Sequence, residues 1–324
     1  MKKGRSWGLA TVGALLWLSA GVECGEAKPN YPMKPIEMIV AYPAGGGQDV
    51  NMRILAKHVE KYARVRVVVI NKVGGGGVVG TTEMARAKPD GYTLGTLHTG
   101  AVTDELTIKG LPYTHKSFIP VMRVGADPHL VVIKNSLNMN FKQFIEFVKK
   151  SPGKVAIGVG GTWTTHDFLR VKIEKGIGLQ FLRTPFQGGA PAVQAVAGGH
   201  IDCSTPLLPE GLPSIEGKLV TPIANSGPQR SPAVPKVPTI RELGYNIVET
   251  IWRGISVPPG TPGEVITFLE DAFLKACQDP DFQKDLRKAG GTPSCMNRKE
   301  FTKFYQEEFA SYSQMIQDLG IVPK

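Results

Sequence analysis

The sequence predicts an α/β protein with two lobes, and three observations support this fold class. Apolar runs of strand length alternate with helical patterns along most of the chain. The 324 residues exceed the comfortable size of one hydrophobic core. The composition, 42% hydrophobic and 20% charged, is typical of globular domains, and 38 glycines with 25 prolines indicate many loops. We therefore expect parallel sheets covered by helices, with ligands bound where strands end and helices begin.

The expected elements follow from periodicity and from turn residues. Strands are predicted at residues 37–42, 65–70, 92–97, 118–124, 130–133, 155–159, 179–182 and 200–204. Helices are predicted at residues 49–63, 78–88, 141–150, 165–175, 190–197, 262–278, 281–288 and 299–319. Pro89-Asp90-Gly91 and Ser151-Pro152-Gly153 mark two of the helix ends, because proline and glycine interrupt helices.

Residues 1–27 have the features of a signal peptide. Lys2, Lys3 and Arg5 precede an apolar run at residues 7–20, which is too short and too interrupted for a comfortable membrane span. Cleavage after Ala27 or after Cys24 suits the small-residue rule. A lipid-anchored Cys24 and an uncleaved anchor are the alternatives. We expect an exported, soluble mature protein.

The charge favours an anionic ligand or partner. The chain carries a net charge of +10; residues 1–27 hold three positive and two negative charges, so the remainder still carries +9. Lysines and arginines are scattered, with no basic tract interleaved with aromatic residues, and this argues against nucleic acid.

Three cysteines follow the predicted leader: Cys203, Cys277 and Cys295. Export permits a disulfide, and Cys277 and Cys295 lie 18 residues apart. A bridge and two free thiols both remain open, because the sequence does not supply the required geometry. No CxxC or HxxxH pair occurs, so we expect no metal site.

Three glycine-containing loops each follow an apolar run and precede a predicted helix. They span residues 42–49, 158–166 and 184–191. The start of a helix presents unpaired N–H groups and partial positive charge, and glycine lets an anion approach the backbone. Any one of these loops could be a plain turn without a ligand. Three glycine-containing loops of this kind in one chain favour an anion site.

A nucleotide-dependent enzyme is a different class to weigh. Residues 75–80 match GxGxxG after a predicted strand, but the next strand ends without an acidic residue for a ribose. The opening loop lacks the GK[ST] of a P-loop, and no GxSxG occurs after the predicted leader. His166 and Asp167 are neighbours on a helix and point about 100° apart, so they form no dyad. No set of nucleophile, base and oxyanion hole emerges.

Seven segments closely resemble the Bug family, the extracytoplasmic solute receptors of tripartite tricarboxylate transporters. They are YPMKPIEMIVAYPAGGGQD, VVVINKVGGGGVVG, AKPDGYTL, LPYTHKSFIPV, TPFQGGAPAVQAVAGGHID, SPAVPKVPTIRELGY and SVPPGTPGEV. The resemblance runs from Tyr31 to the C-terminus. It implies a periplasmic binding protein of type II, with two α/β lobes, a ligand cleft and a hinge. We expect residues 28–124 and 226–324 in one lobe and residues 125–225 in the other.

The resemblance also implies the site. The loop from Ala44 to Asp49 would hold one carboxylate through backbone N–H groups and bridging water, and the loop from Gly160 to Thr165 would supply donors for the other end. Residues 187–190 would close the floor of the pocket. The predicted ligand-binding residues are Tyr42, Ala44, Gly46, Gly47, Gln48, Asp49, His98, Thr99, Gly160, Thr162, Trp163, Thr164, Thr165, Gln187, Gly188, Gly189, Ala190 and Thr205.

Some residues differ from those usual in the family, and we expect these positions to influence which ligand binds. Gln48 stands where threonine is common, and its longer amide can reach a ligand. Trp163 stands where small polar residues are usual; it would stack on a flat ligand or fold back onto the lobe. Asp49 is either a first-turn acid that stabilises the helix or a partner for an ammonium group. His98 either faces the cleft or is structural.

The predicted function is capture of a small organic carboxylate and its delivery to a membrane permease. Di- and tricarboxylates, acidic amino acids and aromatic carboxylates are the candidate ligands. The predicted receptor is a monomer without cofactor, metal or catalytic residues. A carboxylate sensor that signals to a two-component kinase is the alternative, and a nucleotide-dependent enzyme is the remote one.

Overall fold

The computed structural model describes residues 31–322 together with Met1 and Gly4. The predicted leader lies outside these residues. Residues from Pro32 onward form one unit, and within it the strands form two sheets. None of the helices among residues 31–322 combines the length and the apolar character that crossing a membrane requires.

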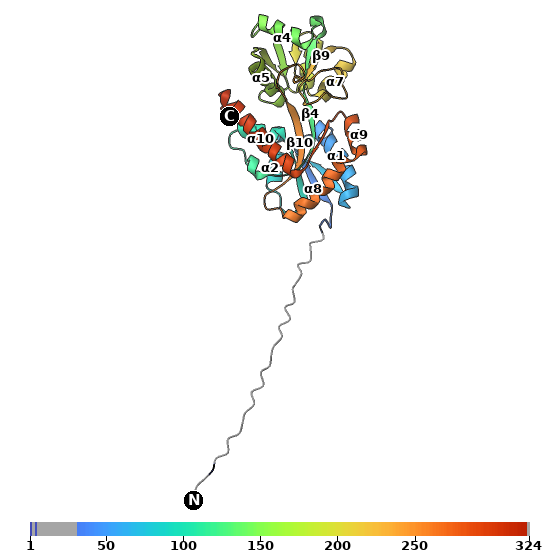
Figure 1. Ribbon diagram of the computed structural model, residues 1–324, viewed down its shortest axis with the longest axis vertical. Coiled ribbons are helices and arrows are strands. Elements are labelled where there is room, and N and C mark those ends of the chain that lie inside the picture. Colours follow the sequence, from blue (N-terminus) through green and yellow to red (C-terminus); the bar gives the residue numbers. More distant parts are fainter. Residues whose placement is uncertain (2–3, 5–30, 323–324) are drawn as a thin grey trace. The chain divides into compact units, whose positions relative to one another are not determined.

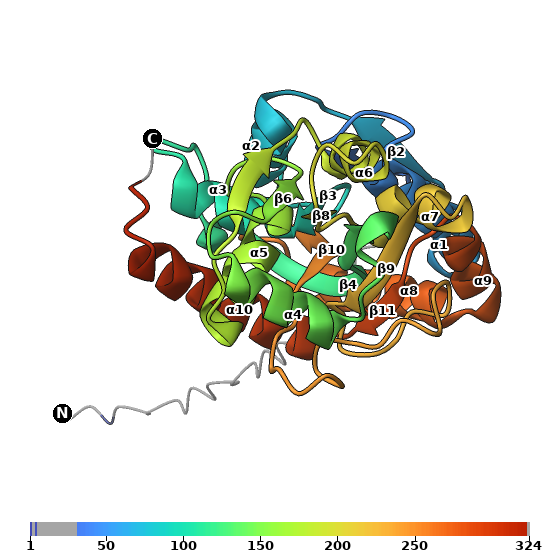
Figure 2. The same cartoon turned by 90° about the horizontal axis from the view of Figure 1, so that it is seen from above.

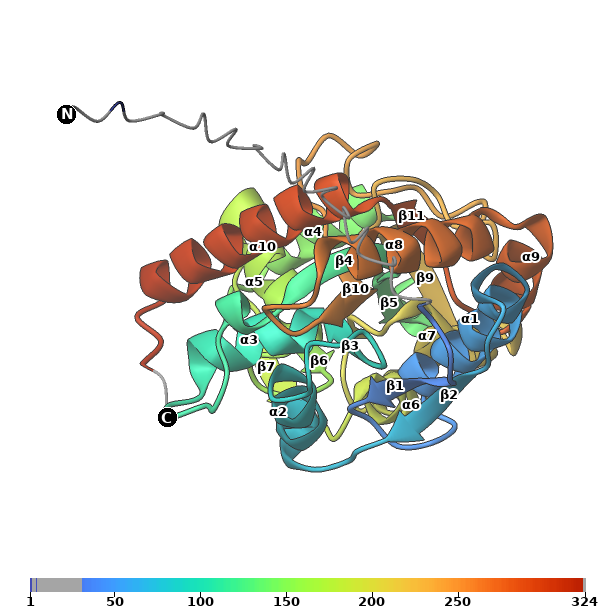
Figure 3. The ribbon, with the colours of Figure 1, turned by 90° about the horizontal axis from the view of Figure 1, so that it is seen from below.

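The first sheet has the strand order β11-β4-β10-β3-β1-β2. Its strands are β1 (Ile36–Val40), β2 (Val67–Asn71), β3 (Thr93–His98), β4 (Ile119–Pro128), β10 (Thr250–Val257) and β11 (Pro293–Met296). Its helices are α1 (Gly47–Ala63), α2 (Val78–Ala85), α3 (Thr99–Thr107), α8 (Gly263–Gln278), α9 (Pro280–Lys288) and α10 (Arg298–Asp318), with the 3-10 turns η1 (Gly75–Gly77) and η2 (His115–Ser117). Figure 3 shows α1, α8 and α9 on one side of this sheet and α2, α3 and α10 on the other.

The second sheet has the order β7-β6-β8-β5-β9. Its strands are β5 (Leu130–Lys134), β6 (Ala156–Val159), β7 (Leu182–Pro185), β8 (Cys203–Ser204) and β9 (Val220–Asn225). Its helices are α4 (Phe141–Lys150), α5 (Thr165–Ile177), α6 (Gly189–Ala197) and α7 (Leu208–Glu216), with the turn η3 (Asn135–Leu137). From above, α4 and α5 lie on one side of this sheet and α6 and α7 on the other (Figure 2).

The chain leaves the first sheet at Pro128 and rejoins it at Thr250. In Figure 1, β4 and β10 lie side by side and run toward the second sheet, in agreement with their antiparallel pairing. This arrangement, with two α/β lobes joined by two crossing segments, confirms the predicted two-lobed fold.

Helix α4 illustrates how sequence determines an element. Phe141, Phe144, Ile145 and Val148 recur at helical spacing and are all buried. Asn140 caps the helix: its side chain accepts a hydrogen bond from the N–H of residue 143 at 3.0 Å. The apolar stripe covers the second sheet and contributes to its core.

Two expectations about the sheets are wrong. The sheets are mixed rather than parallel: β10 runs antiparallel to β3 and β4, and β5 runs antiparallel to β8 and β9. The strand expected at residues 179–182 begins only at Leu182. The apolar residue Leu179 instead closes the end of α5, because its N–H and that of Gly178 both donate to the carbonyl of Glu174. Helices α3 and α7 and strands β9, β10 and β11 were not expected.

The last helix, α10, contacts both lobes. The ring of Tyr312 meets Phe168 of α5 edge-on, with centroids 5.1 Å apart. The Tyr312 hydroxyl donates to the buried carboxylate of Glu249, and Lys172 of α5 lies 2.5 Å from the same carboxylate. Helix α5 of the second lobe is therefore attached to α10 in two ways: by the ring contact of Phe168 with Tyr312, and through the Glu249 carboxylate, which binds both Lys172 and the Tyr312 hydroxyl.

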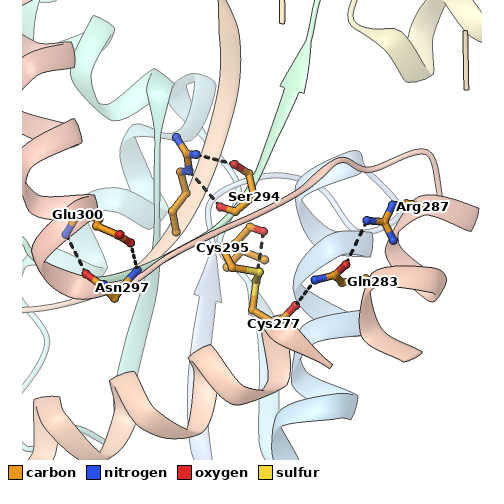
Figure 4. Close-up of a disulfide and its surroundings, with 9 residues drawn as sticks. Cys277, Gln283, Arg287, Ser294, Cys295, Asn297 and Glu300 are labelled. Carbon is orange, nitrogen blue, oxygen red and sulfur yellow. Dashed lines mark hydrogen bonds between the residues drawn. A yellow bond between two sulfur atoms is a disulfide. The ribbon is translucent and has the colours of Figure 1, made fainter. Parts of the chain in front are cut away.

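Cys277 and Cys295 form a disulfide, which settles the alternative left open by the sequence. It joins the end of α8 to β11, with Cα atoms 6.0 Å apart, and Figure 4 shows Gln283 donating to the carbonyl of Cys277 beside it. Cys203 is a buried free thiol.

Candidate functional site

A cavity of about 400 Å³ lies where the two lobes meet, and we call it the interlobe cavity. Residues from both lobes line it: Tyr42, Pro43, Gly46, Gly47, Gln48, Asn51, His98, Asp127, His166, Leu207, Pro209, Glu210, Ile251, Arg253, Ala289 and Gly291. A larger hollow of about 610 Å³ lies beside α4 and β9, but none of the three glycine loops lines it. The interlobe cavity is the candidate ligand site because strand ends and helix starts from both lobes converge there.

The opening loop is held in shape by Asp49. Its carboxylate accepts hydrogen bonds from the N–H of Gly45 at 2.9 Å, from Arg53 Nε at 2.9 Å and from Asn71 Nδ2 at 2.8 Å. Burial raises the pKa of Asp49, but these hydrogen bonds outweigh it and hold the pKa below its usual value. Gly45 has a φ of 80°, a conformation that glycine adopts without strain. Asp49 thus fixes the loop and does not line the cavity.

Helix α1 begins inside the cavity wall. Its N-cap is Gly46, which has no side chain to cap the helix, so the first turn presents N–H groups without intrahelical partners. Gly47 and Gln48 of this turn both line the cavity, and Gln48 is only 7% exposed. The helix start therefore offers donors and partial positive charge to an anion.

Arg253 and Asp127 form a buried ion pair beside this helix start. Arg253, in β10, is 6% exposed, and its Nη1 bonds Asp127 Oδ2. The other Asp127 oxygen accepts from the N–H of Thr292 at 2.7 Å. The Asn51 amide, with its nitrogen donating to Gly47 O, accepts from Arg253 Nη1 at 3.0 Å. The guanidinium lies close to α1, since a Cβ on Gly47 would be 3.7 Å from Nη2.

His166 and Glu210 form the wall contributed by the second lobe. His166 Nε2 lies 2.8 Å from Glu210 Oε2, which also accepts from the N–H of Leu207 at 2.8 Å. Burial raises the pKa of Glu210, but the hydrogen bonds from His166, Leu207 and the N–H of Gly189 outweigh it and hold the pKa below its usual value. Glu210 is therefore a carboxylate at neutral pH, and it lies at the start of α6.

Tyr42 and His98 form the floor of the cavity near β3. Their rings meet edge-on with centroids 5.2 Å apart. His98 Nδ1 accepts from the N–H of Ala101 and so caps α3. Burial and, to a smaller extent, the charge of Arg253 lower the pKa of His98 to about 4, so this ring is neutral at physiological pH.

The structure brings five of the predicted ligand residues into the interlobe cavity: Tyr42, Gly46, Gly47, Gln48 and His98. The other residues of the opening set do not line it. Ala44 is exposed, and the Thr99 hydroxyl accepts from the N–H of Trp252 at 3.0 Å.

Of the second predicted loop, residues 158–165 lie outside the cavity lining, and only His166 at its end lines the cavity. The Thr164 hydroxyl donates to the carbonyl of Gly161 at 3.1 Å, Thr162 is exposed, and Thr165 is buried. The Trp163 ring lies beside Phe168, with centroids 6.4 Å apart, and beneath the guanidinium of Arg183 at 5.1 Å.

The third loop lies behind the second-lobe wall. A Cβ on Gly160 would meet the backbone of Gly188 and Gly189 and the ring of His166, and a Cβ on Gly189 would meet Glu210. These glycines let the loops approach the His166–Glu210 pair. Gln187 and Ala190 are exposed, and the Thr205 hydroxyl donates to the carbonyl of His166 at 2.9 Å.

The sequence analysis did not predict Asn51, Asp127, Glu210 and Arg253 as cavity residues. It considered His166 only as a catalytic base, and rejected that role. One signal was available: Arg253 interrupts an apolar run, and buried arginine needs a partner. Glu210 gave no signal, because its cavity position depends on the loop before α7.

The GxGxxG match does not contribute to the interlobe cavity. Gly75–Gly77 form η1, and Gly80 lies in α2 with its Cα facing β1, where a Cβ would be 2.8 Å from Ala41 Cα. This glycine serves close packing of helix on sheet. In the part of the chain that the structure describes, no group of three or more histidine, cysteine or acidic side chains could hold a metal ion.

Two α/β lobes with a ligand-sized cavity between them, lined by helix starts, define a solute-binding protein of the type II periplasmic class. The family model described as tripartite tricarboxylate transporter family receptor (TctC) matches residues 51–321. The chain belongs to this family, whose members are extracytoplasmic solute receptors.

Comparisons with individual proteins agree with this family assignment. The chain is 32% identical to the Cupriavidus necator "UPF0065 protein in gbd 5'region", over 97% of this chain and 96% of that protein. It is 28% identical to "Protein BugT" of Bordetella pertussis, over 96% of this chain and 97% of that one. A TctC solute-binding protein from Polaromonas, solved without ligand, superposes with a TM-score of 0.80 at 30% identity, covering 89% of this chain and 99% of that one. The predicted Bug family and type II fold are confirmed.

Proposed function

We propose that this protein is a periplasmic receptor that captures a small organic carboxylate between its lobes and delivers it to the permease of a tripartite tricarboxylate transporter. The observation that carries the proposal is the uncapped start of α1, which lies in the interlobe cavity beside Arg253. The family's name supports a carboxylate and a transporter as partners.

The α1 start suits a carboxylate for physical reasons. Gly46 and Gly47 leave its N–H groups open to a ligand, and Gln48 adds an amide at the same wall. Each hydrogen bond to a charged group contributes about 1.5–3 kcal/mol. Three such bonds support micromolar binding, about −8 kcal/mol, after ordering costs.

The protein acts as a monomer, binds without chemistry and needs no cofactor. Residues 1–27 direct export and are removed. We place the lobe boundaries where the chain crosses, after Pro128 and before Thr250, rather than at the expected residues 125 and 226, because Val234 and Ile240 pack in the core of the second lobe. Closure about the two crossing segments encloses the ligand.

A thermal-shift screen of the mature protein tests the proposal. The screen contains mono-, di- and tricarboxylates, each with its uncharged amide, and a set of nucleotides. A ligand at 100 times its Kd adds about 2.7 kcal/mol of stability. We expect at least one acid to raise Tm and its amide to have no effect. A rise with a nucleotide and none with any acid would refute the proposal.

Gln48→Leu connects the binding to the cavity. We expect it to lower affinity for that acid at least several-fold with little change in Tm of the free protein. Gln306→Leu, on an exposed position of α10, is the matched control and leaves affinity unchanged.

A further inference from the structure

We propose that the ligand carries a hydrogen-bond-donating group, a protonated amine above all, opposite its carboxylate, so that the receptor takes an amino carboxylic acid in preference to a dicarboxylate. The donor group binds at the Glu210–His166 pair, and the carboxylate binds at the start of α1. This inference rests on the proposed function and names the ligand class of the same cavity.

The position where a second ligand carboxylate would bind is already filled. Helix α6 begins at Gly189, and its N-cap Gly188 has no side chain to cap it. The carboxylate of Glu210 lies at this helix start and also accepts from Leu207 N and His166 Nε2. A helix start that is satisfied by the protein's own carboxylate cannot also hold one from the ligand. A second ligand carboxylate would instead meet a like charge.

The charges along the cavity also disfavour a dianion. Its lining residues include one arginine, Arg253, and two acids, Asp127 and Glu210. Arg253 is already paired with Asp127, and His98 is neutral. Glu210 is therefore the acidic group of the lining that no arginine or lysine of the same lining balances, and its charge favours a cationic group on the ligand.

Two buried acceptors in the same cavity have no partner among residues 31–322. One is His166 Nδ1, on a side chain that is 7% exposed, and the other is Gln48 Oε1, on a side chain that is also 7% exposed. His166 Nε2 faces the Glu210 carboxylate, which only accepts, so Nε2 carries a proton, and a ring with a single proton then leaves Nδ1 as the acceptor. A buried acceptor without a donor costs free energy, which a ligand N–H recovers.

The test is a set of chain-matched ligands measured by calorimetry on the mature protein. The set pairs 4-aminobutyrate with succinate and butyrate, and 5-aminovalerate with glutarate and valerate, and adds the α-amino acids. We expect an amino acid to bind at least tenfold more tightly than the dicarboxylate and the monocarboxylate of its length, as a charge-assisted hydrogen bond requires.

Glu210→Gln separates a specificity role from a structural one. Glutamine keeps the acceptor for Leu207 N and removes the charge. We expect the affinity for the amino acid to fall at least tenfold and that for the dicarboxylate to rise, while the affinity for the monocarboxylate stays constant. Glu216→Gln makes the same change at the exposed far end of α7 and should leave all three constant.

The outcomes are distinct. Tighter binding of dicarboxylates by the wild type, or an equal loss for all ligands in Glu210→Gln, overturns this inference and leaves the proposed function intact. An absence of binding by every acid in this set overturns this inference, and the proposed function falls as well only where no acid of the thermal-shift screen raises Tm.

Discussion

The disulfide between Cys277 and Cys295 allows a stability prediction that can be worked from the structure. The bridge closes a segment of 18 residues that contains α9 and two residues of the cavity wall, Ala289 and Gly291. In the chain-entropy model, a loop of this length stabilises the folded state by about 3 kcal/mol. For a protein of this size, that corresponds to about 6 °C in Tm, at about 2 °C per kcal/mol.

The assay is urea unfolding of the mature protein with and without a phosphine reductant. We expect the reductant to lower the free energy of unfolding by about 3 kcal/mol. The double variant Cys277→Ala/Cys295→Ala should be less stable by a similar amount, because both changes remove the same cross-link. The reductant should then have no further effect on the double variant, since Cys203 is a free thiol.

Two results would refute this reasoning. An unchanged unfolding midpoint of the wild type under reductant would show that the bridge does not stabilise the fold. A double variant that still responds to reductant would place the redox effect elsewhere in the chain.

Three further predictions concern charge and packing. Burial, followed by repulsion from Glu249, raises the pKa of Glu308 to about 7 from 4.5. The wild type therefore loses stability as pH rises from about 4.5 to 7. At pH 8, Glu308→Gln should be about 3 kcal/mol more stable than the wild type, and at pH 4 the two proteins should be equally stable. Equal stability of the two proteins at both pH values would contradict the assigned pKa. Gly80→Ala forces a Cβ within 2.8 Å of Ala41 Cα, so urea unfolding should show a loss of about 1–3 kcal/mol. Arg253→Met leaves Asp127 buried and unpaired and should cost about 3–5 kcal/mol; adding Asp127→Asn should recover stability but not carboxylate affinity, and recovery of both would exclude Arg253 from the site.

The fold was largely accessible from the sequence, because hydrophobic periodicity is a local property. The expected bounds of α4 agree with the structure, since an amphipathic stripe, a capping asparagine and a Ser-Pro-Gly stop all lie within a few residues. The antiparallel strands were not accessible, because β10 pairs with β3 and β4 across more than 120 residues of chain. Strand direction depends on where the chain crosses between lobes, and no local pattern encodes that.

The site residues, too, were predictable only where they lie close together in the sequence. The opening loop was found because its glycines, Gln48 and the helix start are contiguous in sequence. Asp127, His166, Glu210 and Arg253 come from four separate elements and meet only in the folded protein. Their roles depend on partners that the sequence places far away.

The attachment of α5 to α10 has a consequence for ligand affinity. Helix α5 carries His166 into the cavity, while Phe168 and Lys172 of the same helix are held by Tyr312 and Glu249. Any opening that swings α5 away from α10 must separate these groups, so the attachment opposes it. The apparent Kd is the intrinsic Kd divided by the fraction of receptor that is competent to bind. In the proposed closure, the strength of a contact outside the cavity therefore shifts the open population of the empty receptor, and with it how readily the ligand enters.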